Sequence, residues 1–162
     1  MVGKDLEEFF SNGLSRPVTV ANDADVAGLA EFTFGKRAFR DYSLVVFLTL
    51  GTGIGSAVIY QGRLIPGTEF GHLKFKSDIA ERYASNAIRE LESLTWKKWG
   101  KRLNSYLEFI VYLLSPDAII LGGGVSKKFE KFSIHLSPGV PVFQATLQNK
   151  AGIIGAALLT IK

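Results

Sequence analysis

The stretch Leu48–Gly55 has the glycine pattern of a loop that binds phosphate. Glycines at 51, 53 and 55 surround Thr52, and an apolar run leads into the stretch. Because glycine lacks a Cβ, its N–H groups can approach phosphate oxygens closely. The residues that follow, Ser56–Tyr60, end at the turn Gln61–Gly62 and predict a strand. A dinucleotide-binding or Walker loop would open a helix there. The pattern therefore indicates a hairpin whose bend binds phosphate, or an ordinary tight hairpin.

Two further groups of polar residues have spacings that suit chemistry. Asn22 and Asp23 follow a short apolar run and precede a helical pattern. Either side chain can cap the helix that begins near Ala24. Glu69 and His72 are ionisable side chains three residues apart in a loop over residues 66–72. From residue types alone, a helix cap is the simpler interpretation of the first pair, and a structural role is the more usual one for a single histidine.

Composition limits the class of protein and of ligand. The chain has 162 residues, of which 47% are hydrophobic and 21% charged, as in a folded water-soluble protein. No apolar run approaches the roughly 20 residues that span a bilayer, so we expect no membrane partner and a cytoplasmic location. The absence of cysteine excludes disulfides, a thiol nucleophile and cysteine ligands to zinc. The net charge of +4 suits an anionic ligand such as a nucleotide or polyphosphate.

Hydrophobic periodicity predicts the elements that position these groups. Helices are predicted over residues 4–12, 24–34, 77–94, 103–114, 127–132 (capped by Ser126) and 151–161, with 95–102 as a helix or helix junction. Strands are predicted over residues 16–20, 43–50, 56–60, 63–65, 118–121 and 140–143. Strands that alternate with helices after an antiparallel hairpin indicate a mixed α/β sheet covered by helices. We expect a single domain over residues 1–162.

Four motifs in chain order resemble the ROK family of sugar kinases. They are Val20–Asp25, Leu48–Gly55, Gly67–His72 and Ile120–Val125. Trp96–Trp99 and Asn149–Ala157 are most similar to the polyphosphate/ATP glucokinase branch of that family. The resemblance implies an α/β fold of the actin-like ATPase (ribonuclease-H-like) type, with this chain as its C-terminal lobe and hinge region. It implies phosphoryl transfer from polyphosphate or ATP to the 6-hydroxyl of glucose or a similar hexose.

The resemblance also implies roles for individual residues. Asp23 is expected to be the general base, and Asn22, Glu69 and His72 are expected to bind the sugar. Gly51, Thr52 and Gly53 resemble the family's second phosphate-binding loop. Gly122, Gly123 and Gly124 resemble the loop that approaches the adenosine of the nucleotide. Mg²⁺ is expected with the donor, held mainly by phosphates and water, whereas zinc is not expected because the cysteine cluster of many relatives is missing. A homodimer is expected, and nucleic acid is not an expected partner.

Weaker candidates leave alternatives open. Asp25 is a second candidate for the general base, and Glu81 is either a further sugar contact or a solvated helix acid. A set of basic residues either contacts a long phosphate chain or forms solvated helix faces. These residues are Lys97, Lys98, Lys101, Arg102, Lys127, Lys128 and Lys131.

One departure from the family pattern affects the expected activity. Kinases of this fold carry an Asp-x-Gly-x-Thr phosphate loop in an N-terminal lobe, and no such motif precedes Val20. The chain therefore resembles roughly the last three-fifths of the family, and we expect it to be incomplete as a catalyst. An alternative function is a sugar-sensing module, as in the family's repressors, without the DNA-binding domain. A third possibility is a folded fragment that associates through the face that the missing lobe would cover.

Overall fold

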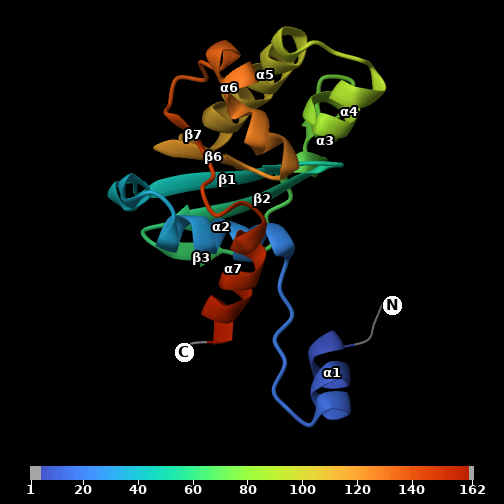
Figure 1. The fold of residues 1–162 in the computed structure, drawn as a ribbon, viewed down its shortest axis with the longest axis vertical. Coiled ribbons are helices and arrows are strands. Elements are labelled where there is room, and N and C mark those ends of the chain that lie inside the picture. Colours follow the sequence, from blue (N-terminus) through green and yellow to red (C-terminus); the bar gives the residue numbers. More distant parts are fainter. Residues whose placement is uncertain (1–4, 161–162) are drawn as a thin grey trace.

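The computed structural model describes residues 5–160 and contains a mixed five-stranded sheet (Figure 1). The strands lie in the order β3 (Arg63–Ile65), β2 (Ile54–Tyr60), β1 (Leu44–Leu50), β6 (Ala118–Gly122) and β7 (Val142–Gln144). Strands β1, β2 and β3 are antiparallel neighbours, whereas β6 is parallel to both β1 and β7. Strands β4 (Lys74–Phe75) and β5 (Asp78–Ile79) form a separate antiparallel pair.

Helices cover both faces of this sheet (Figure 1). The α-helices are α1 (Leu6–Leu14), α2 (Asp23–Phe34), α3 (Glu81–Ala84), α4 (Asn86–Leu91), α5 (Trp96–Leu114), α6 (Phe129–Phe132) and α7 (Ala151–Thr160). Short 3-10 helices occur at η1 (Arg37–Asp41), η2 (Phe70–His72), η3 (Gly124–Lys128), η4 (Ser133–His135) and η5 (Gln148–Lys150). The prediction of a mixed sheet with flanking helices is confirmed.

Strand β1 contributes to a hydrophobic core on each side of the sheet. Alternate residues of a strand point to opposite faces. Val46 and Leu48 therefore pack in the core that α5 covers, and Val45 and Phe47 pack in the core that α2 covers. Burial on both faces explains why this strand is apolar at every position except Thr49, instead of alternating between apolar and polar residues. The sheet thus holds the end of β1 and the start of α2 in fixed relative positions.

The prediction of a buried strand over residues 16–20 is wrong. This segment is extended but forms no strand, and Val20 is exposed. Its N–H groups bind side chains of α1: Val18 N donates to Ser11 Oγ and Val20 N donates to Glu7 Oε1, at 2.9 and 2.8 Å. A strand requires a neighbouring strand, and none of the strands between residues 5 and 160 lies beside this segment.

Two helix predictions are also wrong in detail. The helix expected over residues 77–94 is divided into β5, α3 and α4. The break between α3 and α4 falls at Ser85, whose backbone is extended, and the Trp99 indole donates there to the carbonyl oxygens of Ala84 and Ser85. Ser126 does not cap a helix: its hydroxyl donates to Gly123 O at 2.8 Å, and α6 begins only at Phe129. The predicted helix ends at residues 4 and 161 lie outside the described residues.

No helix within residues 5–160 combines the length and the hydropathy needed to cross a membrane.

Candidate active site

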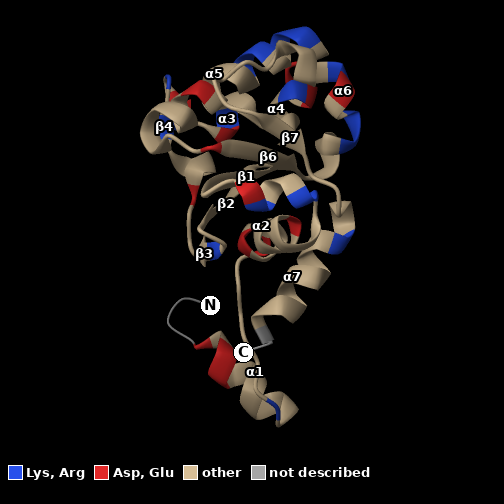
Figure 2. Ribbon diagram, turned by 90° about the vertical axis from the view of Figure 1, so that its left-hand side faces the viewer, with Lys and Arg blue, Asp and Glu red and all other residues tan. Residues whose placement is uncertain are grey.

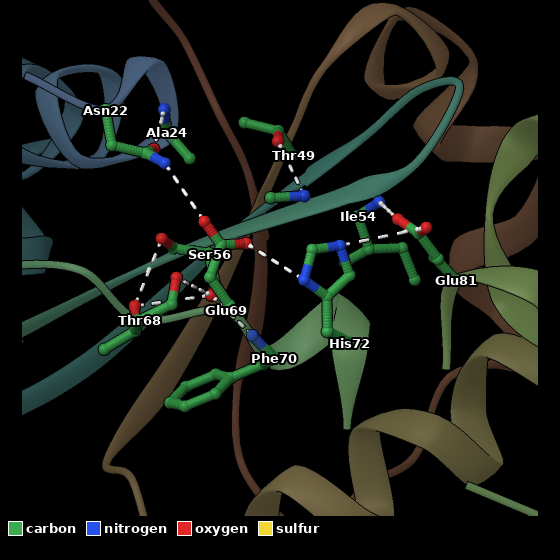
Figure 3. A network of polar contacts seen from close by, with 11 residues as sticks. Asn22, Ala24, Thr49, Ile54, Ser56, Thr68, Glu69, Phe70, His72 and Glu81 are labelled. Atoms are coloured by element: carbon green, nitrogen blue, oxygen red, sulfur yellow. Dashed lines mark hydrogen bonds and ion pairs between the residues drawn. The ribbon is translucent and has the colours of Figure 1, made fainter. Parts of the chain in front are cut away.

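The start of α2 presents two polar side chains with different tasks. Asn22 is the N-cap: its Oδ1 accepts hydrogen bonds from Ala24 N and Asp25 N at 2.8 and 3.3 Å. Its Nδ2 donates to Glu69 Oε1 at 3.2 Å (Figure 3). Asp23 follows as the first helical residue, and its exposed carboxylate has no hydrogen bond or ion pair within the described part of the chain. Because Asn22 supplies the cap, the Asp23 oxygens remain available to accept a proton.

Two buried polar side chains hold the loop that carries Glu69. Asp25, the second candidate base, is buried and its Oδ2 accepts from Gly67 N at 2.9 Å. Ser56, buried in β2, accepts from Phe70 N at 2.9 Å and donates to Thr68 O at 2.8 Å (Figure 3). The backbone is thus held on both sides of Glu69. Asp25 and Ser56 orient the loop and do not line the cavity described below.

His72 lies between two carboxylates in this loop region. Its Nδ1 is 3.9 Å from Glu69 Oε2, and its Nε2 is 3.9 Å from Glu81 Oε1 (Figure 3). Both distances are too long for hydrogen bonds, so both ring nitrogens keep their capacity to bind another group. Glu81, in the first turn of α3, also accepts from Ile54 N at 3.3 Å through Oε2. The structure therefore places Glu81 in the site, not on a solvated helix face.

The glycine bend joins β1 to β2 at residues 51–53. Gly51 N donates to Gly53 O at 3.0 Å inside the bend, and Gly51 O accepts from Ala87 N at 3.1 Å. Gly51 N–H is therefore already bonded, whereas the N–H groups of Thr52 and Gly53 have no acceptor among residues 5–160. These two N–H groups and the exposed Thr52 hydroxyl are the donors that the bend offers to a ligand.

The glycine loop over residues 122–124 packs against the end of β1, next to the glycine bend at residues 51–53. Gly123 has φ of +80°, and a Cβ at this position would lie 2.4 Å from Leu50 O. Only glycine adopts this conformation at low cost and permits so close a contact. Gly123 therefore brings the end of β6 beside the end of β1, where the hairpin bend begins.

These elements enclose two cavities that share residues. The first has a volume of about 380 Å³ and is lined by Asn22, Asp23, Thr49, Gly51, Thr52, Gly53, Ile54, Gly55, Glu69, His72, Glu81 and Gly123. The second, of about 270 Å³, has Gly122, Gln148 and Asn149 in its lining and shares Asp23, Thr49 and Gly123 with the first. Gly124 lines neither cavity. The structure thus gathers most of the predicted site residues in one cavity and assigns Gly122 to its neighbour.

The polar groups of the first cavity define what it can bind. Its lining contains three carboxylates, Asp23, Glu69 and Glu81, and neither lysine nor arginine. Carboxylates accept hydrogen bonds from hydroxyls, so this lining suits a neutral polyol better than a free anion. An anionic group would have to bind through the N–H groups of the glycine bend. Within the described residues, no group of three or more acidic or histidine side chains is arranged to hold a metal ion.

The fold is shared with solved sugar kinases. The inorganic polyphosphate/ATP-glucomannokinase from Arthrobacter sp. strain KM superposes with a TM-score of 0.85 at 38% identity, covering 98% of this chain and 65% of that one. A ROK family glucokinase from Streptomyces griseus, solved with glucose and AMPPNP, has a TM-score of 0.79 at 23% identity, covering 95% of this chain and 71% of that one. The fold is therefore that of the actin-like ATPases, as the resemblance implied.

The sequence comparisons assign the chain to one family of proteins with this fold. The sequence profile of the ROK family matches residues 2–87. The polyphosphate glucokinase of Mycobacterium tuberculosis (strain CDC 1551 / Oshkosh) is 47% identical over 144 residues, which cover 89% of this chain and 54% of that protein. The chain belongs to the ROK family, and it spans about half the length of the curated relatives that it matches.

Proposed function

We propose that the chain forms the sugar-binding, base-carrying part of a kinase that transfers a phosphoryl group from polyphosphate or ATP to the 6-hydroxyl of glucose or a similar hexose. The observation that carries this proposal is that the free carboxylate of Asp23 and the hairpin bend at Thr52 line one cavity. The relatives supply the choice of reaction, since the Mycobacterium tuberculosis protein is a polyphosphate glucokinase and the Arthrobacter protein uses polyphosphate or ATP.

The sugar would occupy the side of the cavity formed by α2, η2 and α3. Glu69 and Glu81 accept hydrogen bonds from ring hydroxyls, while Asn22 Nδ2 and the His72 ring supply donors. Because Asn22 donates to Glu69 at 3.2 Å, the two side chains are already oriented before the sugar binds. Such preorganisation lowers the entropic cost of holding the reactive hydroxyl near Asp23.

Asp23 then acts on the hydroxyl that attacks phosphorus. Its carboxylate accepts the hydroxyl proton as the new oxygen–phosphorus bond forms and the bond from phosphorus to the bridging oxygen breaks. The bridging oxygen leaves with the shortened polyphosphate or with ADP. Little other covalent chemistry is required of the protein, so position and charge stabilisation determine the rate.

The donor would reach the reacting hydroxyl from the glycine loops. The free N–H groups of Thr52 and Gly53 would bind the terminal phosphate, and the second cavity beside Gly122 and Gly123 would hold the rest of the donor. Mg²⁺ would enter bound to the donor phosphates and water, where it neutralises charge.

A glucose 6-phosphate assay tests this proposal. The chain is joined to the N-terminal segment of the Mycobacterium tuberculosis polyphosphate glucokinase that it does not match; we call this protein the completed enzyme. Asp23→Asn should reduce the rate of the completed enzyme by about 10²- to 10⁴-fold, because a positioned base contributes that factor. Asp41→Asn, at an exposed residue of η1, is the matched control and should leave the rate unchanged.

Two outcomes would contradict the proposal. Equal rates for the Asp23→Asn and parent proteins would remove Asp23 from the role of base. A completed enzyme that binds glucose but forms no glucose 6-phosphate with either donor would favour a sugar-sensing module.

A further inference from the structure

A surface formed by α5, η3 and α6 carries lysines that have no anionic partner. They are Lys97, Lys98, Lys101, Lys127, Lys128 and Lys131, and we call them the lysine surface. All six are exposed, and within the described residues none of their ammonium groups forms an ion pair or hydrogen bond. The arginines nearby differ, since Arg89 is paired with Glu90 and Arg102 with Glu92. The lysine charges are therefore uncompensated by the protein.

Packing around Trp96 brings the two groups of lysines together. Lys131 Nζ lies 5.9 Å from the centroid of the Trp96 ring. Trp96 is the first residue of α5 and directly precedes Lys97 and Lys98. The rings of Trp99 and Phe132 also meet, with centroids 4.9 Å apart, and fix α6 against α5. Figure 2 shows basic residues gathered along α5 and α6.

Two residues of the lysine surface destabilise the start of α5 by their charge. The first turn of the helix contains Lys97 and Lys98 and no acidic residue. Cations at a helix N-terminus oppose the macrodipole and destabilise the helix. Glu130 is the acid in α6 and lies among the lysines of η3 and α6. A bound polyanion would offset this unfavourable arrangement.

The lysine surface continues directly from the candidate donor site. Gly123 lines both cavities, and η3 begins at the next residue. A 3-10 helix rises about 2 Å per residue, so Lys127 and Lys128 lie roughly 8–10 Å from Gly123 along the chain. Buried Ser126 fixes this segment through its hydrogen bond to Gly123 O at 2.8 Å. A phosphate chain that leaves the cavity beside Gly123 would therefore meet lysines at once.

We propose that the lysine surface binds the part of a linear polyphosphate chain that extends beyond the cavities. This inference rests on the proposed function, which makes polyphosphate a donor. Polyphosphate is flexible and has no fixed contact geometry, which suits lysine ammonium groups on flexible stems. Single-stranded nucleic acid instead favours exposed aromatic rings on which bases stack. Here the Trp96 ring already stacks with Phe132 and lies under Arg89, at 6.1 and 4.2 Å.

Titration calorimetry of the 162-residue chain tests this inference. Long-chain polyphosphate should bind more tightly than tripolyphosphate, and Lys127→Ala/Lys128→Ala/Lys131→Ala should abolish most of that difference. The slope of log Kd against log salt should fall by about three for this triple variant, since each lost phosphate contact removes about one. Arg16→Ala/Arg37→Ala/Arg63→Ala removes three exposed cations from other elements and is the matched control.

Two results would overturn the inference. Equal losses of affinity in the two triple variants would overturn the assignment of this surface and leave only a general effect of net charge. Single-stranded RNA that competes equally at the same phosphate concentration would overturn the choice of polyphosphate. Glucose affinity, measured on the same variants, reports on the proposed function separately: it should not change, and a chain that never binds glucose would refute that function whatever the polyphosphate result.

Discussion

At the scale of single residues, the site depends on a division of tasks between neighbours. Asn22 uses its oxygen to cap α2 and its amide nitrogen to orient Glu69. Asp23 is thereby left without a partner in the described structure, although a carboxylate at this position can also cap a helix. Glu81 supplies a third carboxylate to the cavity and touches the hairpin at Ile54 N. The resulting site combines a free carboxylate, which we propose to be the base, with oriented acceptors.

Glu81→Gln tests the contribution of that third carboxylate. Hydrogen bonds to charged groups contribute about 1.5–3 kcal/mol, so glucose affinity should fall by about 10- to 100-fold. Glutamine keeps an acceptor oxygen for Ile54 N, so the fold should be retained. Calorimetric titration of glucose measures the effect, with Glu130→Gln, at an exposed residue of α6, as the control. Unchanged affinity for Glu81→Gln would place the sugar elsewhere.

Tyr106→Phe tests a residue of the core. The buried Tyr106 hydroxyl has no hydrogen-bond partner in the described part of the chain, and burial raises the pKa of this phenol. Removing the hydroxyl should therefore raise the free energy of unfolding by about 1 kcal/mol at neutral pH. The phenol ionises more readily in the unfolded chain, so the parent loses stability above about pH 10. Urea denaturation at pH values below and above 10 should show that the Tyr106→Phe variant loses less unfolding free energy than the parent. An equal or larger loss in the variant would show that the buried phenol does not cause the loss.

At the scale of elements, the loop before η2 is held by the sheet and by α2 together. Ser56 in β2 and Asp25 in α2 bind its backbone on either side of Glu69. Gly71 also packs tightly against β2, since a Cβ at this position would lie only 2.1 Å from Ile54 O. The backbone that carries Glu69 and His72 is thus positioned in part by Asp25, Ser56 and Gly71, which do not line the first cavity.

Gly71→Ala should therefore displace the loop that carries Glu69 and His72, our proposed sugar-binding loop, without abolishing the fold. The added methyl group must push η2 away from Ile54, which should weaken glucose binding by about tenfold or more and cost about 1–3 kcal/mol of stability. Gly13→Ala is the control, since nothing lies within 4 Å of a Cβ there and alanine favours helix. Glucose titration and thermal denaturation measure both effects. Full affinity in Gly71→Ala would show that the loop tolerates movement.

The elements that could be predicted from the sequence are those determined by local pattern. Strands β1, β2 and β6 are predominantly apolar runs between turn signals, and the apolar residues of α5 recur with helical period. The break between α3 and α4 could not be predicted, because it depends on the indole of Trp99 from a later helix. The extended segment over residues 16–20 has strand composition, but pairing depends on a neighbour that composition does not specify.

The same distinction applies to the site. The motifs around Asp23, Thr52 and Glu69 are recognisable because each is contiguous in sequence. The supporting bonds join residues far apart in the chain: Asp25 binds Gly67, 42 positions later, and Ser56 binds Phe70, 14 positions later. Such contacts follow only from the packed sheet. The free state of Asp23 likewise becomes evident only when Asn22 is seen to take the cap.

At the scale of the whole molecule, one buried carboxylate joins the C-terminal segment to α2. Glu31 is fully buried and accepts hydrogen bonds from Thr146 N, Thr146 Oγ1 and Leu147 N. These residues precede Gln148 and Asn149, which line the second cavity. Helix α2 therefore carries the proposed base at its start and fixes one wall of the candidate donor cavity near its end.

Glu31→Ala should affect both stability and donor binding. Three donors would lose their acceptor in a buried setting, which should cost about 3 kcal/mol or more. Urea denaturation measures that loss against Glu130→Ala, whose side chain is exposed. In the folded variant, affinity for ATP should fall more than affinity for glucose. Equal affinities for both ligands in variant and parent would show that the second cavity does not depend on this link.

The most direct test of the central claim is a crystal structure of the chain with glucose bound. The account predicts glucose in the cavity between α2 and the hairpin bend, with its 6-hydroxyl oxygen about 2.6–3.2 Å from a carboxylate oxygen of Asp23, the reach of a general base. Glucose bound away from Asp23, or oriented with its 6-hydroxyl pointing away from that carboxylate, would contradict the account.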